Sequence, residues 1–132
     1  MSGPSLDPTV HRAAAEAALR RAASDLRRLL HELVAALDPF PGFLGIRSVQ
    51  AVEVLPAGAP VPDRGCVVVC PDGELHELVL RMIPGPLDTG GVDQVEELKE
   101  LDLPPAEFVA YAYSAIGELT RILDERQRPK GS

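Results

Sequence analysis

The stretch that decides the fold is CVVVCPDGELHELVLRMI, residues 66–83. It predicts a β-hairpin, because Pro71, Asp72 and Gly73 suit a type I turn that is closed by a glycine in the left-handed region. Such a turn fixes the register of the two strands. The expected pairs are Cys70 opposite Glu74, Val68 opposite His76, and Cys66 opposite Leu78.

Successive side chains of a strand point to opposite sides, so the hairpin has two faces. One face carries Cys66, Val68, Cys70, His76, Leu78, Leu80 and Met82, and the other carries Val67, Val69, Leu75, Glu77, Val79, Arg81 and Ile83. We expect the first face to be core. The second, apolar apart from two charges, is expected to be a buried rim or an oligomer surface. A hairpin that is apolar on both faces needs cover on two sides, and we expect a second copy of the chain to supply one of them.

A long amphipathic helix is predicted over residues 9–37. Asp7 can cap it, Pro8 suits its first position, and Asp38-Pro39 ends it. The stripe of apolar residues consists of Leu19, Ala22, Leu26, Leu29, Leu30, Leu33, Ala36 and Leu37. Alanine dominates the first half, at residues 13–18, and buries little area. We therefore expect that half to project or to pack against a close neighbour.

The remaining elements lie between proline- and glycine-rich loops at 39–45, 56–65 and 84–91. Residues 46–55 predict a strand, with irregular alternation at 49–51 that indicates a bulge. Residues 92–101 predict a short acidic helix, and residues 105–127 predict the last helix. The buried stripe of that last helix is expected to contain Phe108, Ala112, Ala115, Leu119 and Ile122, with Val109, Ile116 and Leu123 beside it.

These elements predict an α+β fold in the order α-β-β-β-α-α. A three-stranded, mainly antiparallel sheet is expected to be flanked by a long N-terminal helix and a C-terminal helix. At 132 residues, one domain is the simplest arrangement. We expect a flexible N-terminus at 1–8, a single α+β domain at 9–128, and a disordered tail at 129–132.

Composition excludes several classes of protein. The net charge is −7, which argues against general nucleic-acid binding and against docking on anionic lipid. No apolar run approaches the roughly 18 residues of a membrane span, and the first residues are not expected to form a signal peptide. Two cysteines do not make a disulfide scaffold, so a cytoplasmic location is expected.

Charge is uneven along the chain. Residues 88–107 hold seven acidic side chains against Lys99 alone, while Arg20, Arg21, Arg27 and Arg28 form a basic band on the first helix. The acidic segment is either a solubilising surface or a face for a basic partner. The basic band is either a solvated face, with Asp25 and Glu32 paired to Arg21 and Arg28, or a contact for the acidic segment in the same or a second subunit.

Four residues of the hairpin resemble ligands or catalytic groups: Cys66, Cys70, Glu74 and His76. The two cysteines stand about 13 Å apart on one strand, so they cannot bind one zinc ion or form a disulfide with each other. The trio of Cys70, Glu74 and His76 lacks the spacing of a metal pattern. A cysteine nucleophile would need an orienting group and oxyanion donors that the sequence does not show.

Other candidates are weaker still. His11 and His31 lie about 30 Å apart along one helix and cannot share a site within the chain. The triplet Asp88-Thr89-Gly90 matches the catalytic triplet of aspartic proteases, but without the flanking hydrophobic strands it indicates a plain turn. Phe40 and Phe43 are expected to close one end of the core, or to anchor a ligand or partner.

No residue is therefore assigned a catalytic, cofactor-binding or metal-binding role, and no cofactor is expected. We expect a small acidic, non-enzymatic protein-interaction or regulatory module, such as an adaptor, an inhibitor or a chaperone-like protein. Its expected partners are a second copy in a homodimer and another protein, with no nucleic acid and no membrane. The alternative is a small-ligand-binding protein or enzyme with an apolar pocket between helices and sheet.

Overall fold

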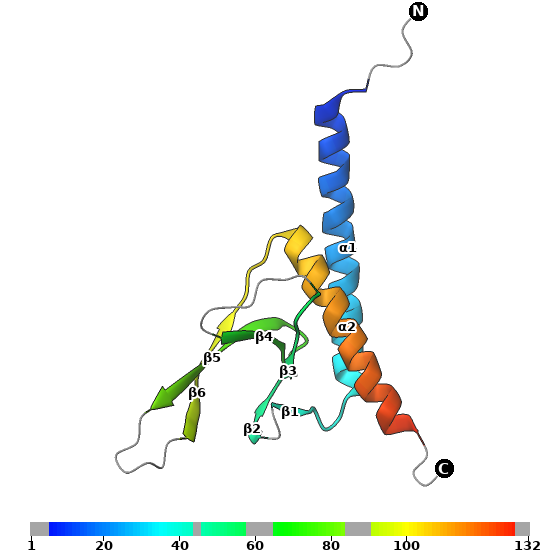
Figure 1. Cartoon of the computed structure of the whole chain (residues 1–132). Coiled ribbons are helices and arrows are strands. Elements are labelled where there is room, and N and C mark those ends of the chain that lie inside the picture. The colour runs from blue at the N-terminus through cyan, green and yellow to red at the C-terminus, as the bar shows by residue number, and fades with distance from the viewer. Residues whose placement is uncertain (1–5, 44–45, 58–64, 84–90, 129–132) are drawn as a thin grey trace, which may run out of the picture.

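The structure is a computed structural model that describes residues 6–43, 46–57, 65–83 and 91–128, without the side chains of 46–48, 65, 80–83 and 91–97. It is an α+β fold in which a long N-terminal helix, small antiparallel sheets and a C-terminal helix pack together (Figure 1). This confirms the predicted fold class. The elements are α1 (Pro8–Ala36), β1 (Gly42–Phe43), β2 (Ile46–Gln50), β3 (Val52–Glu53), β4 (Gly65–Val69), β5 (Leu75–Ile83), β6 (Gly91–Glu100) and α2 (Pro105–Gln127).

The long helix α1 begins and ends close to the residues that predicted its bounds. The Asp7 side chain accepts a hydrogen bond of 3.0 Å from the Thr9 backbone N–H, and Pro8 occupies the first turn. No glycine or proline interrupts the helix until Asp38-Pro39. The prediction of a helix over 9–37 is confirmed to within one residue at each end.

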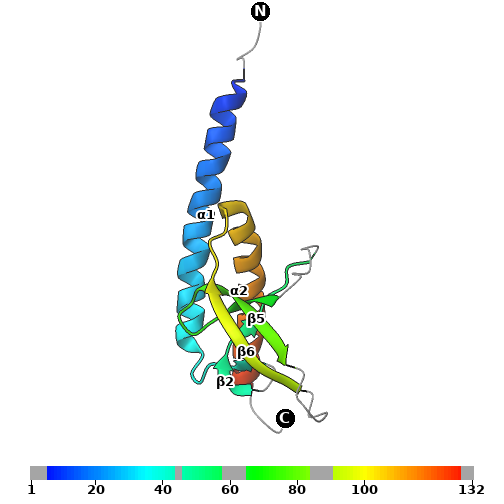
Figure 2. The same ribbon diagram turned by 90° about the vertical axis from the view of Figure 1, so that its left-hand side faces the viewer.

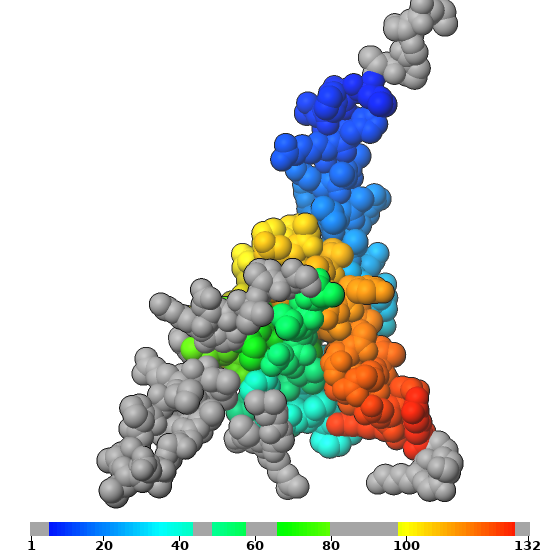
Figure 3. All heavy atoms as spheres, in the orientation of Figure 1, coloured from blue at the N-terminus to red at the C-terminus, as the bar shows by residue number. Residues whose placement is uncertain are grey.

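Only the C-terminal half of α1 is covered by the rest of the chain. Leu30, Val34 and Leu37 are buried, with Leu26 and Leu33 partly buried beside them. Every residue of 6–21 is exposed. Figures 1 and 2 show this N-terminal half projecting beyond the body of the molecule, and Figure 3 shows it as a narrow extension. We call residues 8–21 the arm; its projection confirms one of the two expectations for the alanine-rich half.

The second helix, α2, packs along the covered half of α1. Its fully buried residues are Ala112, Ala115 and Leu119, and the larger side chains Phe108 and Ile122 are partly buried at the edges of the same stripe. The two alanines let the helix axes approach closely. The predicted bounds and the predicted stripe are both confirmed.

The hairpin β4–β5 has the predicted register, with Cys66 opposite Leu78 and Val68 opposite His76. Gly73 has a φ of +79°, as the turn requires. The second face of the hairpin was predicted to be a buried rim or an oligomer surface. This prediction was wrong for the part of that face next to the turn. There Val67, Val69 and Leu75 are buried against the two helices in the main core.

The first face of the hairpin is core as predicted at Val68, Cys70 and Leu78, and its cover also comes from within the chain. Cys66 and His76 on this face are only partly buried, and the side chains of Leu80 and Met82 lie outside the described part of the structure. Val68, Cys70 and Leu78 pack against Phe43 and Ala51, which belong to the segment after α1. Sequence reasoning treated residues 39–45 as a loop, whereas Gly42–Phe43 forms the strand β1 and pairs with β2. The chain therefore covers both faces of the hairpin near its turn, and no second copy is needed there.

The predicted strand over 46–55 is divided at Ala51. Its first part, β2, pairs with β1 in a two-stranded sheet, and its second part, β3, joins a four-stranded sheet in the order β3-β4-β5-β6. All pairs are antiparallel. The irregular alternation that indicated a bulge at 49–51 lies where the chain passes from one sheet to the other.

The acidic helix predicted over 92–101 is wrong, because this segment is the strand β6. The order α-β-β-β-α-α and the three-stranded sheet are therefore corrected: the described residues form two helices, and the main sheet has four strands. β6 pairs with the free edge of the nine-residue strand β5 and so provides hydrogen-bond partners for its backbone. Two irregularities, at Val79/Leu80 and Arg81/Met82, interrupt the register. Bulges break the alternation of side chains, so the spacing resembled that of a helix.

Candidate functional site

The two cysteines are free thiols in an apolar setting. Burial, aided by the charge of Glu53, raises the pKa of Cys66 to about 11. Burial, aided by the charge of Asp72, raises the pKa of Cys70 to about 12. Both thiols are therefore protonated at neutral pH, and neither is activated as a nucleophile.

His76 belongs to the turn rather than to a cysteine. Its Nε2–H donates a 2.8 Å hydrogen bond to Oδ2 of Asp72, whose Oδ1 accepts from the Glu74 backbone N–H at 2.9 Å. The side chain of His76 is largely buried, and its Nδ1 has no hydrogen-bond partner among the described residues. Asp72 thus fixes both the turn and the histidine.

The trio of Cys70, Glu74 and His76, which lacks the spacing of a metal pattern, is not brought together as a ligand set. Glu74 extends to α1, while His76 bonds to Asp72. Within the part of the chain that the structure describes, no group of three histidine, cysteine or acidic side chains could hold a metal ion.

A polar cluster that sequence reasoning missed joins the hairpin turn to α1. The Arg27 Nε–H donates to Oε2 of Glu74 at 3.0 Å, and a second guanidinium nitrogen bonds the other carboxylate oxygen. The His31 Nε2–H donates to Oε2 of Glu74 at 2.5 Å. Burial opposes ionisation of Glu74, but the hydrogen bonds and charges of Arg27 and His31 outweigh it and lower its pKa.

The cluster is packed as well as hydrogen-bonded, because the His31 ring lies directly over Gly73. A Cβ atom on Gly73 would stand 2.9 Å from the ring atoms Cγ and Nδ1. Arg27 and His31 are four residues apart on one helix face, which indicates a shared contact. Their partner Glu74 is more than forty residues away in the sequence, so no local pattern could identify it.

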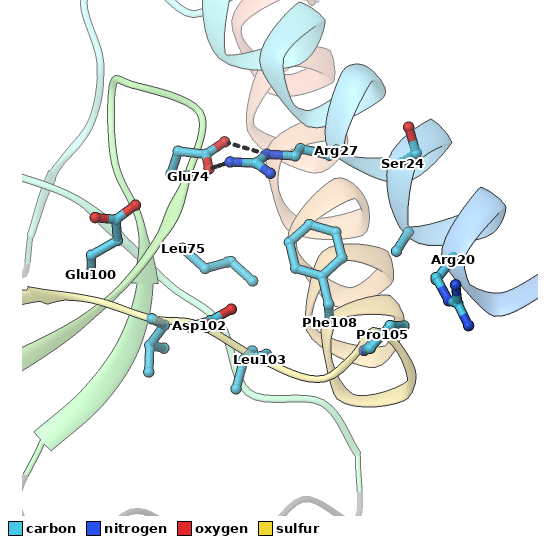
Figure 4. A pocket seen from close by; sticks show the side chains of 12 residues that line it. Arg20, Ser24, Arg27, Glu74, Leu75, Glu100, Asp102, Leu103, Pro105 and Phe108 are labelled. Carbon is cyan, nitrogen blue, oxygen red and sulfur yellow. Dashed lines mark hydrogen bonds and ion pairs between the residues drawn. The ribbon is translucent and has the colours of Figure 1, made fainter. Parts of the chain in front are cut away.

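A groove of about 600 Å³ lies beside this cluster, between α1, the hairpin turn and the link from β6 to α2 (Figure 4). Arg20 and Arg27 line it from α1. Glu100 and Asp102 line it from the opposite side. Its apolar lining is supplied by Ala23, Leu75, Leu101, Leu103, Pro105 and Phe108.

The basic band is therefore divided between two environments. Arg27 faces the hairpin turn: its pKa is raised mainly by the hydrogen bond and charge of Glu74, and to a smaller degree by the charge of Glu100 in the acidic segment. Arg28 instead pairs along the helix with Glu32 at 3.4 Å, as predicted, and Asp25 lies 4.0 Å from Arg28 rather than being paired as expected with Arg21.

The other sequence candidates that the structure describes, His11, Phe40 and Phe43, have structural roles. The His11 Nδ1–H donates to the Asp7 carbonyl at 3.0 Å, in the first turn of α1 and far along the helix from His31. Phe40 and Phe43 are both buried, each in a different part of the core. The triplet Asp88-Thr89-Gly90 lies outside the described residues.

The arm carries a distinct surface. Its exposed apolar side chains include Val10, Leu19 and the alanines of residues 13–18. Charged side chains of alternating sign recur every four residues along the arm, at Arg12, Glu16 and Arg20. Arg12 Nε lies 3.5 Å from Oε1 of Glu16, and Arg20 Nη2 lies 3.9 Å from its Oε2.

Comparisons with family models, with curated proteins and with solved structures find no match to this chain. No helix among the described residues is long and apolar enough to cross a membrane. The function must therefore be argued from the surfaces and side chains described above.

Proposed function

We propose that this chain is a small, acidic, non-enzymatic protein-interaction module, of the adaptor, inhibitor or chaperone-like kind, and that it acts as a homo-oligomer. The observation that supports the proposal is the arm. Residues 8–21 form about 20 Å of helix with every side chain exposed and with small apolar residues between the charges. Such a helix presents an accessible surface for another helix.

The chemistry of the core is consistent with this proposal. Both cysteines have pKa values raised far above neutral pH. Among the residues whose side chains are described, no polar or charged residue is fully buried, and the largely buried His76 is bonded to the turn residue Asp72. Convergent, buried polar groups are what an active site usually requires, and the described groove offers exposed charges instead.

The alternative function is binding of a small ligand in the groove. Its volume of about 600 Å³ falls in the range of ligand sites. The groove is lined by both charges, with Arg27 more than half exposed, so a ligand there would compete with water at each polar contact. The groove therefore supports ligand binding less well than the arm supports protein binding.

The proposal is tested by the mass of the full-length protein in solution. Sedimentation equilibrium between about 1 and 100 μM should give a mass above the 14.1 kDa of one chain. A mass of 14.1 kDa at every concentration would contradict self-association. Affinity purification from the native host separates the two functional classes, because a stoichiometric protein supports the module and a co-purifying metabolite supports the ligand site.

A further inference from the structure

We propose that the groove between α1, the hairpin turn and the link from β6 to α2 binds a segment of a protein partner in which a lysine or arginine stands next to an apolar side chain. The cation lies against Glu100 and Asp102, and the apolar side chain lies on the floor of the groove. This inference rests on the protein-interaction module proposed above, and it names the site and the chemistry of the partner. Two observations support it: the apolar floor of the groove and the balance of charge along its sides.

The floor of the groove is a part of the main core that the chain does not cover completely. Leu101, Leu103 and Phe108 pack against that core but are only partly buried. Figure 4 shows the Phe108 ring in the middle of the groove, between α1 and the link that carries Asp102. An apolar side chain placed on this floor would remove the remaining exposed surface of these residues from water, which contributes directly to affinity.

The two arginines of the groove already have acidic partners. Glu74 accepts hydrogen bonds from Arg27, and Oε2 of Glu16 lies 3.9 Å from Nη2 of Arg20. An anion that entered the groove would compete with these carboxylates for the same guanidinium nitrogens. The arginine side of the groove therefore does not favour an anionic ligand.

The carboxylates on the opposite side of the groove have no such partners. Glu100 and Asp102 are exposed, and neither forms an ion pair or a side-chain hydrogen bond with another residue whose side chain is described. The sequence around them is also acidic, since residues 88–107 hold seven acidic side chains against one lysine. This excess of negative charge attracts a basic segment and repels an acidic one, so it gives the site its selectivity.

The exposure of these carboxylates favours a peptide segment over a small amine. An ion pair that stays in contact with water contributes only about 0–1 kcal/mol. A small amine can reach one carboxylate and part of the floor. A segment that crosses the groove can contact both carboxylates and cover the floor, and it gains from all of these contacts together.

The experiment is an NMR titration of the isotope-labelled, full-length protein with synthetic peptides. The probe peptide GKLGKLG carries lysines beside leucines, GELGELG reverses its charge, and GKSGKSG removes its apolar side chains. GKLGKLG should shift the backbone resonances of the groove residues Ala23, Leu101 and Phe108. Its dissociation constant should be about tenfold lower than that of either other peptide, because only GKLGKLG matches both the floor and the charges.

Charge-reversed variants test the role of the two carboxylates. Glu100→Lys/Asp102→Lys should raise the dissociation constant of GKLGKLG about tenfold. The same variant should bind GELGELG more tightly than the wild type does, which also shows that it is folded.

A matched control makes the same change in net charge outside the groove. Glu32 and Glu125 are exposed carboxylates on α1 and α2 that do not line the groove. Glu32→Lys/Glu125→Lys should change the dissociation constant of GKLGKLG by less than about threefold, because salt screens distant charges. An equal loss of binding in this control overturns the inference, since a general attraction to an acidic protein then accounts for it.

Phenethylamine covers the small-ligand alternative, because it carries a cation and an apolar ring without a peptide backbone. If it binds in the groove as tightly as GKLGKLG does, the inference of a peptide site is wrong. A wild-type oligomer that binds none of the peptides overturns the inference and leaves the proposed function standing. A wild-type monomer that binds GKLGKLG in the groove supports the inference and contradicts only the homo-oligomer.

Discussion

Gly73→Ala tests the junction between the hairpin turn and α1. The φ of +79° at this position costs an alanine about 1–2 kcal/mol relative to glycine. The new Cβ would also stand 2.9 Å from two atoms of the His31 ring, which must move away. That movement disturbs the His31–Glu74 hydrogen bond, whose loss costs about 1 kcal/mol. We expect a total loss of about 2–3 kcal/mol in the free energy of unfolding.

The two contributions can be separated by a double-mutant cycle with His31→Ala. Without the ring, the methyl group that Gly73→Ala adds has room, and only the backbone cost of about 1–2 kcal/mol remains. The coupling between the two positions should therefore be about 1 kcal/mol. Urea denaturation followed by circular dichroism measures all four proteins, and an unchanged m value shows that each of them exposes the same surface on unfolding.

Gly117→Ala is the matched control, because Gly117 lies in α2 and a Cβ atom added there would have no neighbouring atom within 4 Å. Here alanine should stabilise the protein by about 0.5–1 kcal/mol through helix propensity. A loss below about 0.5 kcal/mol for Gly73→Ala would refute the left-handed turn. If Gly73→Ala lowers the free energy of unfolding equally in the wild type and in the His31→Ala variant, the ring does not lie over the turn.

Three further predictions concern the core, the thiols and Glu74. Leu119→Ala should cost about 3–4 kcal/mol in denaturant melts, because Leu119 is fully buried, while Leu26→Ala at its partly buried site should cost about 1–2 kcal/mol. Both cysteines should react with a thiol reagent at neutral pH far more slowly in the native protein than in urea, and a full equivalent of fast native reaction would contradict the raised pKa values. The lowered pKa of Glu74 stabilises the fold above its ordinary pKa, and this contribution is lost as the pH falls through the folded value. The stability difference between wild type and Glu74→Gln should therefore shrink below about pH 4, and a difference that does not change with pH would refute this prediction.

The sequence was sufficient for those elements whose signals are local. Asp7 and Pro8 mark the start of α1, and Asp38-Pro39 marks its end. The turn at Pro71, Asp72 and Gly73 determines the register of β4 and β5, because few backbone conformations close so short a connection. These predictions depend on residues that are neighbours in the chain, and the structure confirms them.

The sequence was insufficient where a distant partner decides the conformation. Residues 92–101 contain valine and leucine at three-residue spacing, which favours a helix when read alone. Pairing with β5 makes them the strand β6 instead. The cluster around Glu74 shows the same limitation for side chains. The helix pattern places Arg27 and His31 together, but only the fold brings the hairpin turn to them.

The corrected fold also changes the physical reason for the proposed self-association. The sequence suggested that the hairpin would need cover from a second copy, but the helices and the β1–β2 segment cover both of its faces near the turn. Among the described residues, the arm is the longest continuous stretch in which every residue is exposed. Its alanines and arginines are strong helix formers, and it continues a helix that is already anchored at Leu30 and Leu37, so it needs no partner to become helical. A second copy would therefore bind a surface that is already ordered, and association would carry little entropic cost for folding the arm.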